Sequence, residues 1–265
     1  MASPMFPSPL RSAPRMRFLL LPSVVLTFAA TALSEIPSSA VWPLPVVPPG
    51  ANPVTIATPR DEWVARVQQA LNLTRGKQYD LIFDGDSITD GWQGKGKAVW
   101  MEHYGAIKAI DFGISADKVE NLLWRLQQGQ ADGLDPKLVV LMIGTNNSAL
   151  NTVDQIAEGI SVVTAEYVKR CPHAHILLLG IFPRSPLPTD PIRGKIAAIN
   201  KKIEALQSDR VEYLDIGSKF LQPDGTLTVE IMPDFLHPSE KGYEIWANAI
   251  QPVVDKWLKE TPGKY

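Results

Sequence analysis

A serine that follows a buried apolar segment is the first candidate for chemistry in this chain. The apolar run of residues 79–84 leads directly into Gly85-Asp86-Ser87. A serine at the carboxyl end of a parallel strand faces the crevice in which open α/β sheets bind ligands. A hydroxyl is a weak nucleophile at neutral pH, so a catalytic role also requires a base and hydrogen-bond donors for an oxyanion. On its own, Ser87 could equally cap the helix that follows.

The candidate base is His237, and the candidate acid that orients it is Asp234. Of the four histidines, only His237 has a carboxylate three residues earlier and a helix start directly after it, which Pro238 indicates as the first helical position. By accepting a hydrogen bond from Nδ1, Asp234 would leave Nε2 of His237 free to face Ser87. Asp215, at the end of a predicted strand, is a rival carboxylate that lies further from His237 in the sequence.

The remaining polar motifs follow two other predicted strands. Gly113 comes after one of them, and Gly144-Thr145-Asn146-Asn147 comes after the next. With Gly-Asp-Ser at 85–87 and Asp-x-x-His at 234–237, they stand in the order of the four blocks of the SGNH, or GDSL-type, hydrolases. The chain resembles this family from about residue 61 to residue 258.

One branch of the family fits best. Residues 123–126 (Leu-Trp-Arg-Leu), 144–147 and 242–243 (Gly-Tyr) resemble the catalytic subunits of intracellular platelet-activating-factor acetylhydrolase. Asn147 stands where the wider family more often has Asp, and this branch also carries Asn there.

The resemblance implies a catalytic triad of Ser87, Asp234 and His237. It implies an oxyanion hole made by the backbone N–H groups of Ser87 and Gly113 and the side-chain amide of Asn146, in which one donor contributes about 3 kcal/mol. Asp86 and Asn147 are expected to hold these groups in place through hydrogen bonds. Neither a metal nor an organic cofactor is needed for this chemistry.

Five apolar runs bounded by turn residues predict buried parallel strands. The strands are expected at 79–84, 109–113, 138–143, 176–181 and 211–216. Amphipathic patterns between and around them predict helices at 61–73, 117–128, 153–168, 192–206 and 239–258. Strands that alternate with helices specify right-handed crossovers and helices on both faces of a sheet.

The predicted fold is therefore a three-layer α/β/α sandwich around a five-stranded parallel sheet. The family resemblance, rather than the spacing, implies a flavodoxin-like strand order of 2-1-3-4-5. In that order the switch point falls between strands 1 and 3, where Ser87 and the 144–146 loop emerge together.

The first fifty residues differ in composition from this domain. Arg11, Arg15 and Arg17 precede an apolar run from 18 to 33, and Ala30-Thr31-Ala32 offers a cleavage site. This order predicts a secretory signal peptide at 1–32, with an uncleaved anchor as the alternative. Several prolines mark a linker at 33–58, so the hydrolase domain is expected at 59–265. The protein is then secreted or periplasmic, without stable membrane insertion once the signal is removed.

Composition narrows the classes of partner and site. A formal charge of −2 gives no electrostatic reason to expect nucleic acid as a partner. Cys171 is the only cysteine, which excludes an internal disulfide and favours an inert thiol. His173 and His175 have the spacing of a metal pair, but we expect them in a loop that leads into the strand at 176–181 rather than in a metal site.

We therefore expect a secreted serine esterase that hydrolyses short-chain esters, acetyl above all, through an acyl-enzyme. Its substrate would be a small-molecule ester, either an acetylated carbohydrate or a lipid. The acyl pocket is expected to be formed by Ile88, Ile114 and Leu236. A lysophospholipase or thioesterase of the same fold and a non-catalytic binding module remain alternatives, whereas the lack of Gly-x-Ser-x-Gly argues against an α/β-hydrolase elbow.

Overall fold

A parallel sheet carries the candidate site residues at its carboxyl edge. The computed structural model describes residues 43–60, 62 and 64–259. The described residues all belong to one compact unit. The predicted signal peptide, and the predicted linker up to residue 42, lie outside the described residues.

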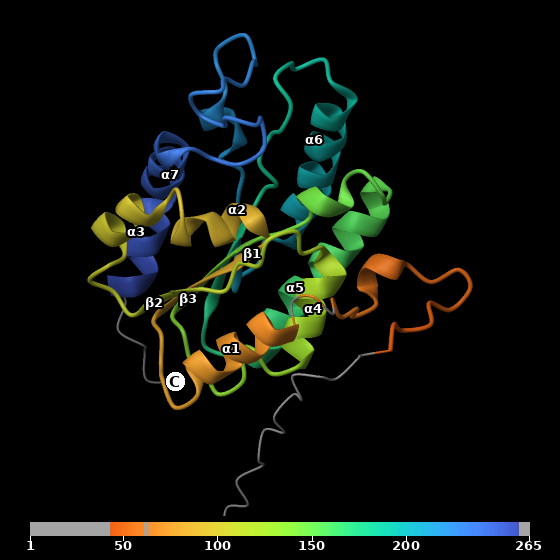
Figure 1. Ribbon diagram of the computed structural model, residues 1–265, viewed down its shortest axis with the longest axis vertical. Coiled ribbons are helices and arrows are strands. Elements are labelled where there is room, and N and C mark those ends of the chain that lie inside the picture. The colour runs from red at the N-terminus through yellow and green to blue at the C-terminus, as the bar shows by residue number, and fades with distance from the viewer. Residues whose placement is uncertain (1–42, 61, 63, 260–265) are drawn as a thin grey trace, which may run out of the picture. The chain divides into compact units, whose positions relative to one another are not determined.

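The sheet has five parallel strands in the order β2-β1-β3-β4-β5, as predicted (Figure 1). The strands are β1 (Leu81–Gly85), β2 (Ala109–Asp111), β3 (Leu138–Met142), β4 (His175–Leu179) and β5 (Val211–Leu214). In the register of β1 with β3, Gly85 lies opposite Met142. The loops that follow these two strands therefore begin side by side.

Alternate residues of the strands face two separate cores, which makes the fold a three-layer sandwich. In β3, Val139 packs with helices α4 (Val119–Gln127), α5 (Val153–Arg170) and α6 (Pro191–Ile203). Its neighbour Val140 packs with α3 (Lys97–His103) and α7 (Glu240–Lys259) on the opposite face. Figure 1 shows α3 and α7 together, across the sheet from α4 and α5. Helix α1 (Val64–Thr74) packs against α4 through a third, smaller cluster.

The structure also contains short helices that hydrophobic periodicity does not predict. They are α2 (Ser87–Asp90), α3, and the 3-10 turns η1 (Pro53–Thr55), η3 (Gly91–Gln93), η4 (Thr145–Asn147), η5 (Glu204–Leu206) and η6 (Gly217–Phe220). The long C-terminal helix begins at Glu240, so Pro238 is not its first residue. Ser239 caps α7 instead, because its carbonyl accepts from the N–H of Tyr243 and its Oγ accepts from the N–H of Gly242.

The end of the predicted linker packs against the domain. Val54 lies in η1, is fully buried, and belongs to the core beneath α4 and α5. Asn52 Nδ2 donates a hydrogen bond of 2.9 Å to the carbonyl of Gln155 in α5. A proline-rich composition therefore does not make this whole segment an unattached spacer.

No helix among the described residues has the length and apolarity needed to cross a bilayer.

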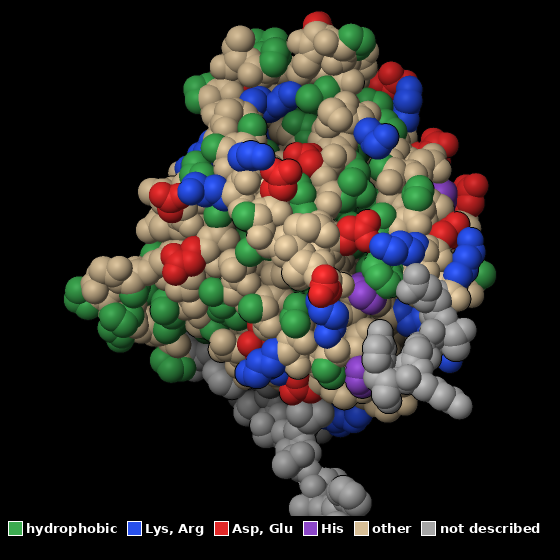
Figure 2. All heavy atoms as spheres, turned by 180° about the vertical axis from the view of Figure 1, so that it is seen from behind, with side chains coloured by type: hydrophobic (Ala, Val, Ile, Leu, Met, Phe, Trp, Pro, Cys, Tyr) green, Lys and Arg blue, Asp and Glu red, His purple; other side chains and the backbone are tan. Residues whose placement is uncertain are grey.

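On the face seen in Figure 2, basic and acidic side chains are interspersed. That face carries no continuous area of one charge.

Candidate active site

Ser87, His237 and Asp234 form the hydrogen-bonded chain that their motifs predict. Ser87 begins α2 directly after β1, and His237 lies in the loop before α7. Ser87 Oγ is 2.8 Å from His237 Nε2. His237 Nδ1 is 2.6 Å from Asp234 Oδ2. The imidazole can therefore accept the serine proton on one side while the carboxylate holds its other nitrogen.

A tight turn places Asp234 against His237. Asp234 Oδ1 accepts hydrogen bonds from the backbone N–H groups of Leu236 and His237, at 3.1 and 2.8 Å. Phe235, between Asp234 and Leu236, has a φ of 57°. A non-glycine residue keeps this conformation only where its surroundings impose it. Partial burial works to raise the pKa of Asp234, but the hydrogen bonds from His237 outweigh it and lower the pKa to about 2. Asp234 is therefore an anion throughout the neutral range.

Asp86 supports the nucleophile by capping α2. Its Oδ1 accepts from the N–H of Ile88 at 3.0 Å, and burial raises the pKa of Asp86 to about 7. The N–H of Ser87 has no hydrogen-bond partner within the described part of the chain. An unsatisfied N–H at the start of a helix is suited to a developing negative charge.

Asn146 follows β3 at the sheet edge where Ser87 follows β1. Its Nδ2 donates to the backbone carbonyl of Asp117 at 2.9 Å. This bond uses one of the two amide hydrogens and fixes the orientation of the group. Asn147 is fully buried and accepts from the N–H of Val119 while donating to Glu120, so it anchors the loop to α4.

The structure contradicts the prediction that Gly113 supplies an oxyanion donor. Its N–H already donates to Asp111 Oδ1 at 2.8 Å. Gly113 has a packing role, since a Cβ there would lie 2.2 Å from the backbone nitrogen of Asp90 in α2. In the same loop, Ala116 has a φ of 62°, which is rare for a residue with a side chain.

Ser87 and His237 open into a cleft of about 730 Å³. The cleft is lined by Arg66, Gln69, Ser87, Asp90, Gly91, Gln93, Gly94, Lys95, Ser115, His237, Pro238 and Tyr243. Inside it, the Asp90 carboxylate accepts hydrogen bonds from Arg66, one of them at 3.1 Å, and from Ser115 Oγ. Pro238 and Tyr243 contribute apolar side-chain surface, and no Val, Leu, Ile or Met is among the residues that line the cleft.

None of the three residues predicted to form the acyl pocket lines this cleft. Ile88 and Ile114 are almost fully buried, and each packs in a hydrophobic core. Neither lines the cleft. Leu236 is partly buried against the core beneath α7 and does not line it either.

The rival carboxylate Asp215 and the two histidines with metal-like spacing have partners outside the triad. Asp215 accepts from the N–H of Gly217 at 2.7 Å and from Asn200 at 3.1 Å. His173 pairs with Asp135, whereas the ring of His175 stacks on Trp257. Across the described ranges there is no group of three or more residues suited to hold a metal.

Residues 83–245 match the model of the GDSL-like lipase/acylhydrolase family. In sequence, the chain is 32% identical over 204 residues to the α2 subunit of platelet-activating factor acetylhydrolase IB from Rattus norvegicus, covering 76% of this chain and 87% of the relative.

In structure, the chain is similar to a GDSL-like lipase from Bacteroides thetaiotaomicron. The TM-score is 0.57 at 21% identity, covering 74% of this chain and 96% of that one. It is also similar to an acetylxylan esterase from Geobacillus stearothermophilus, with a TM-score of 0.51 at 18% identity, covering 71% of this chain and 97% of that one. Both likenesses concern the fold.

Proposed function

Because the chain belongs to the GDSL-like lipase/acylhydrolase family and is a carboxylic ester hydrolase, we propose that it cleaves short-chain esters through an acyl-enzyme on Ser87. The observation that carries this proposal is the continuous chain from Ser87 Oγ through His237 to Asp234. Each residue in it has the partner that its role requires.

In the first half-reaction, Ser87 Oγ attacks the ester carbonyl while His237 Nε2 takes the serine proton. The tetrahedral intermediate collapses as His237 returns this proton to the leaving alcohol, which leaves an acyl group on Ser87. In the second half-reaction, a water attacks the acyl group with His237 as base, and the acid is released. Asp234 stabilises the imidazolium in both halves.

Three donors converge on the oxyanion in this proposal. Two are the N–H of Ser87 and the second hydrogen of the Asn146 amide. Since Gly113 is engaged with Asp111, we assign the third to the backbone N–H of Ala116, in the loop after β2. Its left-handed backbone is the kind of local strain that clusters at functional sites.

Replacement of Ser87 by alanine tests the mechanism. In Ser87→Ala we expect kcat on p-nitrophenyl acetate to fall by roughly three orders of magnitude or more, with the fold intact by circular dichroism. An organophosphate should label the wild-type serine covalently. Absence of labelling would favour the binding-module alternative, and near-normal turnover by a folded Ser87→Ala protein would rule out the mechanism.

The acyl group that we propose is acetyl. The relative is an acetylhydrolase by name, and the residues that line the cleft beside Ser87 include Pro238 but no Val, Leu, Ile or Met that could hold a long chain. Activity should therefore fall steeply from p-nitrophenyl acetate to the octanoate. A flat or rising series would favour a lysophospholipase or thioesterase instead.

For the alcohol part of the substrate, we favour a carbohydrate over a phospholipid. Gln69, Gln93 and Lys95 offer hydrogen-bond donors and acceptors to hydroxyl groups. Deacetylation of acetylated oligosaccharides should exceed that of an acetylated phospholipid when kcat/KM values are compared at equal detergent concentration. The reverse order would assign the enzyme to lipids.

We further propose export, on the strength of the arginines and the apolar run before Ala32. The mature protein should begin at Leu33, or at Val41 if cleavage follows Ser38-Ser39-Ala40. Amino-terminal sequencing of protein from the periplasm or the medium tests this. An intact terminus in a membrane fraction would instead indicate an anchor.

A further inference from the structure

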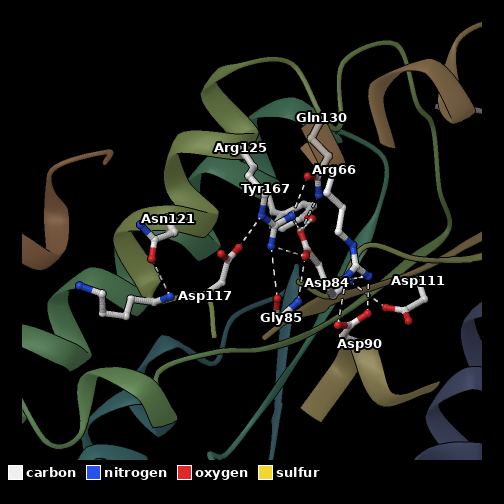
Figure 3. A network of polar contacts seen from close by, with 12 residues as sticks. Arg66, Asp84, Gly85, Asp90, Asp111, Asp117, Asn121, Arg125, Gln130 and Tyr167 are labelled. Carbon is white, nitrogen blue, oxygen red and sulfur yellow. Dashed lines mark hydrogen bonds and ion pairs between the residues drawn. The ribbon is translucent and has the colours of Figure 1, made fainter. Parts of the chain in front are cut away.

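Beneath the two loops of the site lies a buried ion cluster of Asp84, Asp117, Arg125, Gln130 and Tyr167 (Figure 3). Each of these residues is at most 1% exposed. None of their side chains takes part in the ester hydrolysis proposed above. Stability alone does not explain a guanidinium in this place, because a buried ion pair is seldom more stabilising than apolar residues of the same volume.

One arm of Arg125 holds the end of β1. Its Nη2 donates to Asp84 Oδ1 at 3.0 Å and to the carbonyl of Gly85 at 3.2 Å. Gly85 is two residues before Ser87. The guanidinium therefore fixes the backbone from which the nucleophile projects.

The other side of the same guanidinium holds the loop after β2. Arg125 Nε donates to Asp117 Oδ2 at 2.7 Å. The backbone carbonyl of Asp117 in turn accepts the hydrogen bond that orients the amide of Asn146. A single planar group thus connects the turn of the nucleophile with the support of the oxyanion amide.

We propose that Arg125 is a positioning residue that sets the separation between Ser87 and Asn146 in the transition state. This inference rests on the proposed function, in which Asn146 donates to the oxyanion. Only a planar fork with several donors in fixed directions can contact Gly85, Asp84 and Asp117 at once. Lysine keeps the charge but not this geometry.

A positioning role predicts a particular kinetic signature. The oxyanion exists only along the reaction, so a misplaced amide lowers kcat and leaves KM nearly unchanged. For Arg125→Lys we expect kcat to fall about 10- to 100-fold, since displacement of a supporting group by about 1 Å can have an effect of that size. All rates are counted per active site by titration with an organophosphate, which removes any contribution from unfolded protein.

The deciding experiment is a double-mutant cycle of Arg125→Lys with Asn146→Ala. If Arg125 acts through Asn146, its substitution should reduce kcat by less than about threefold once the amide is absent. Fully multiplicative effects would overturn the positioning role and leave the proposed function intact. No effect of Asn146→Ala alone would instead remove Asn146 from the oxyanion hole, and the inference with it.

Two further variants keep the result interpretable. Asp117→Asn breaks the ion pair but keeps the backbone carbonyl that Asn146 uses, so it replaces Arg125→Lys in the cycle if the lysine variant does not fold.

Tyr167→Phe is the matched control, because the tyrosine hydroxyl donates to Asp84 within the same cluster and has no bond to Gly85 or Asp117. It should lower Tm and combine multiplicatively with Asn146→Ala. Non-additivity of this control as large as that of Arg125 would overturn the proposal.

Discussion

At the scale of single residues, Asp234 and Asn146 support the same reaction at different moments. Asp234 acts on His237 before and during proton transfer, whereas the Asn146 amide acts only on the charge that develops on the substrate oxygen. The two contributions should therefore separate when the proton on the nucleophile is made easier to remove.

Asp234→Asn and Asn146→Ala should accordingly differ in their pH profiles. The pKa of Asp234 is about 2, so the wild-type carboxylate stays ionised across the measurable range and does not set an acid limb. The defect of Asp234→Asn should ease at high pH, because the base is then less necessary. Asn146→Ala should lose about 10²–10³ in kcat at every pH, with little change in KM. Superimposable profiles from pH 5 to 10 would contradict separate roles.

Asp86 links the active-site turn to the stability of the fold. Its pKa in the folded state is about 7, because burial disfavours its charge, against about 3.9 in an unfolded chain. A raised pKa of this kind contributes stability that is fully present below about pH 4 and is lost as pH rises through 7. The free energy of unfolding should thus fall between pH 4 and 8, by a few kcal/mol at most.

The matched test is Asp86→Asn, which can still cap α2 but cannot ionise. Urea denaturation at several pH values should show a shallower fall in stability for this variant than for the wild type. An equal slope for both proteins would assign the pH dependence to other carboxylates.

At the scale of elements, the nucleophile and the base are held together by the contact between α2 and α7. Tyr243 of α7 donates a hydrogen bond of 2.7 Å to the carbonyl of Ile88 in α2. Gly91 allows this approach, since a Cβ there would lie 1.9 Å from the hydroxyl of Tyr243. Ser87 is the first residue of α2, and His237 lies in the loop directly before α7.

Gly91→Ala should therefore lower both stability and kcat, because Tyr243 must move and the loop that carries His237 moves with it. Gly194→Ala is the control, since Gly194 is exposed within α6 and nothing lies within 4 Å of its Cβ position. This change should raise the unfolding free energy by about 0.5–1 kcal/mol and leave kcat unchanged. Normal kcat in Gly91→Ala would show that the helix contact does not position the base.

Sequence patterns predict the elements whose residues are close along the chain better than they predict contacts between loops. The strands and the triad follow from apolar runs and from short motifs whose members lie within a few residues. The oxyanion role predicted for Gly113 is wrong because nothing in the local pattern reveals that Asp111, two residues away, turns its carboxylate back onto the glycine N–H. The contacts of Arg125 are not evident from the sequence, since its partners lie in the loop after β2, 8 residues away, and at the end of β1, 40 residues away.

At the scale of the whole molecule, the hydrolase domain extends further toward the N-terminus than its composition indicates. Prolines around residues 43–53 favour an extended spacer. The composition therefore does not reveal that Val54, directly after them, is buried in the core. Val54 reaches α5, where a Cβ on Gly159 would lie 2.4 Å from its Cγ1. The N–H of Thr58 also donates to the carbonyl of Glu120 in α4, at 2.9 Å.

A chain that starts at Pro59, the predicted domain boundary, should therefore be less stable than one that starts at Pro43. The loss of Val54 burial and of the Asn52 hydrogen bond should lower the unfolding free energy by about 2–4 kcal/mol, measured by urea denaturation. Val54→Ala in the longer chain should reproduce a substantial part of this loss, and equal stabilities of the two chains would show that the segment docks without contributing. Both proposed cleavage sites, before Leu33 and before Val41, precede Asn52. Cleavage at either proposed site would therefore leave Asn52 and Val54, which pack against the domain, in the mature enzyme.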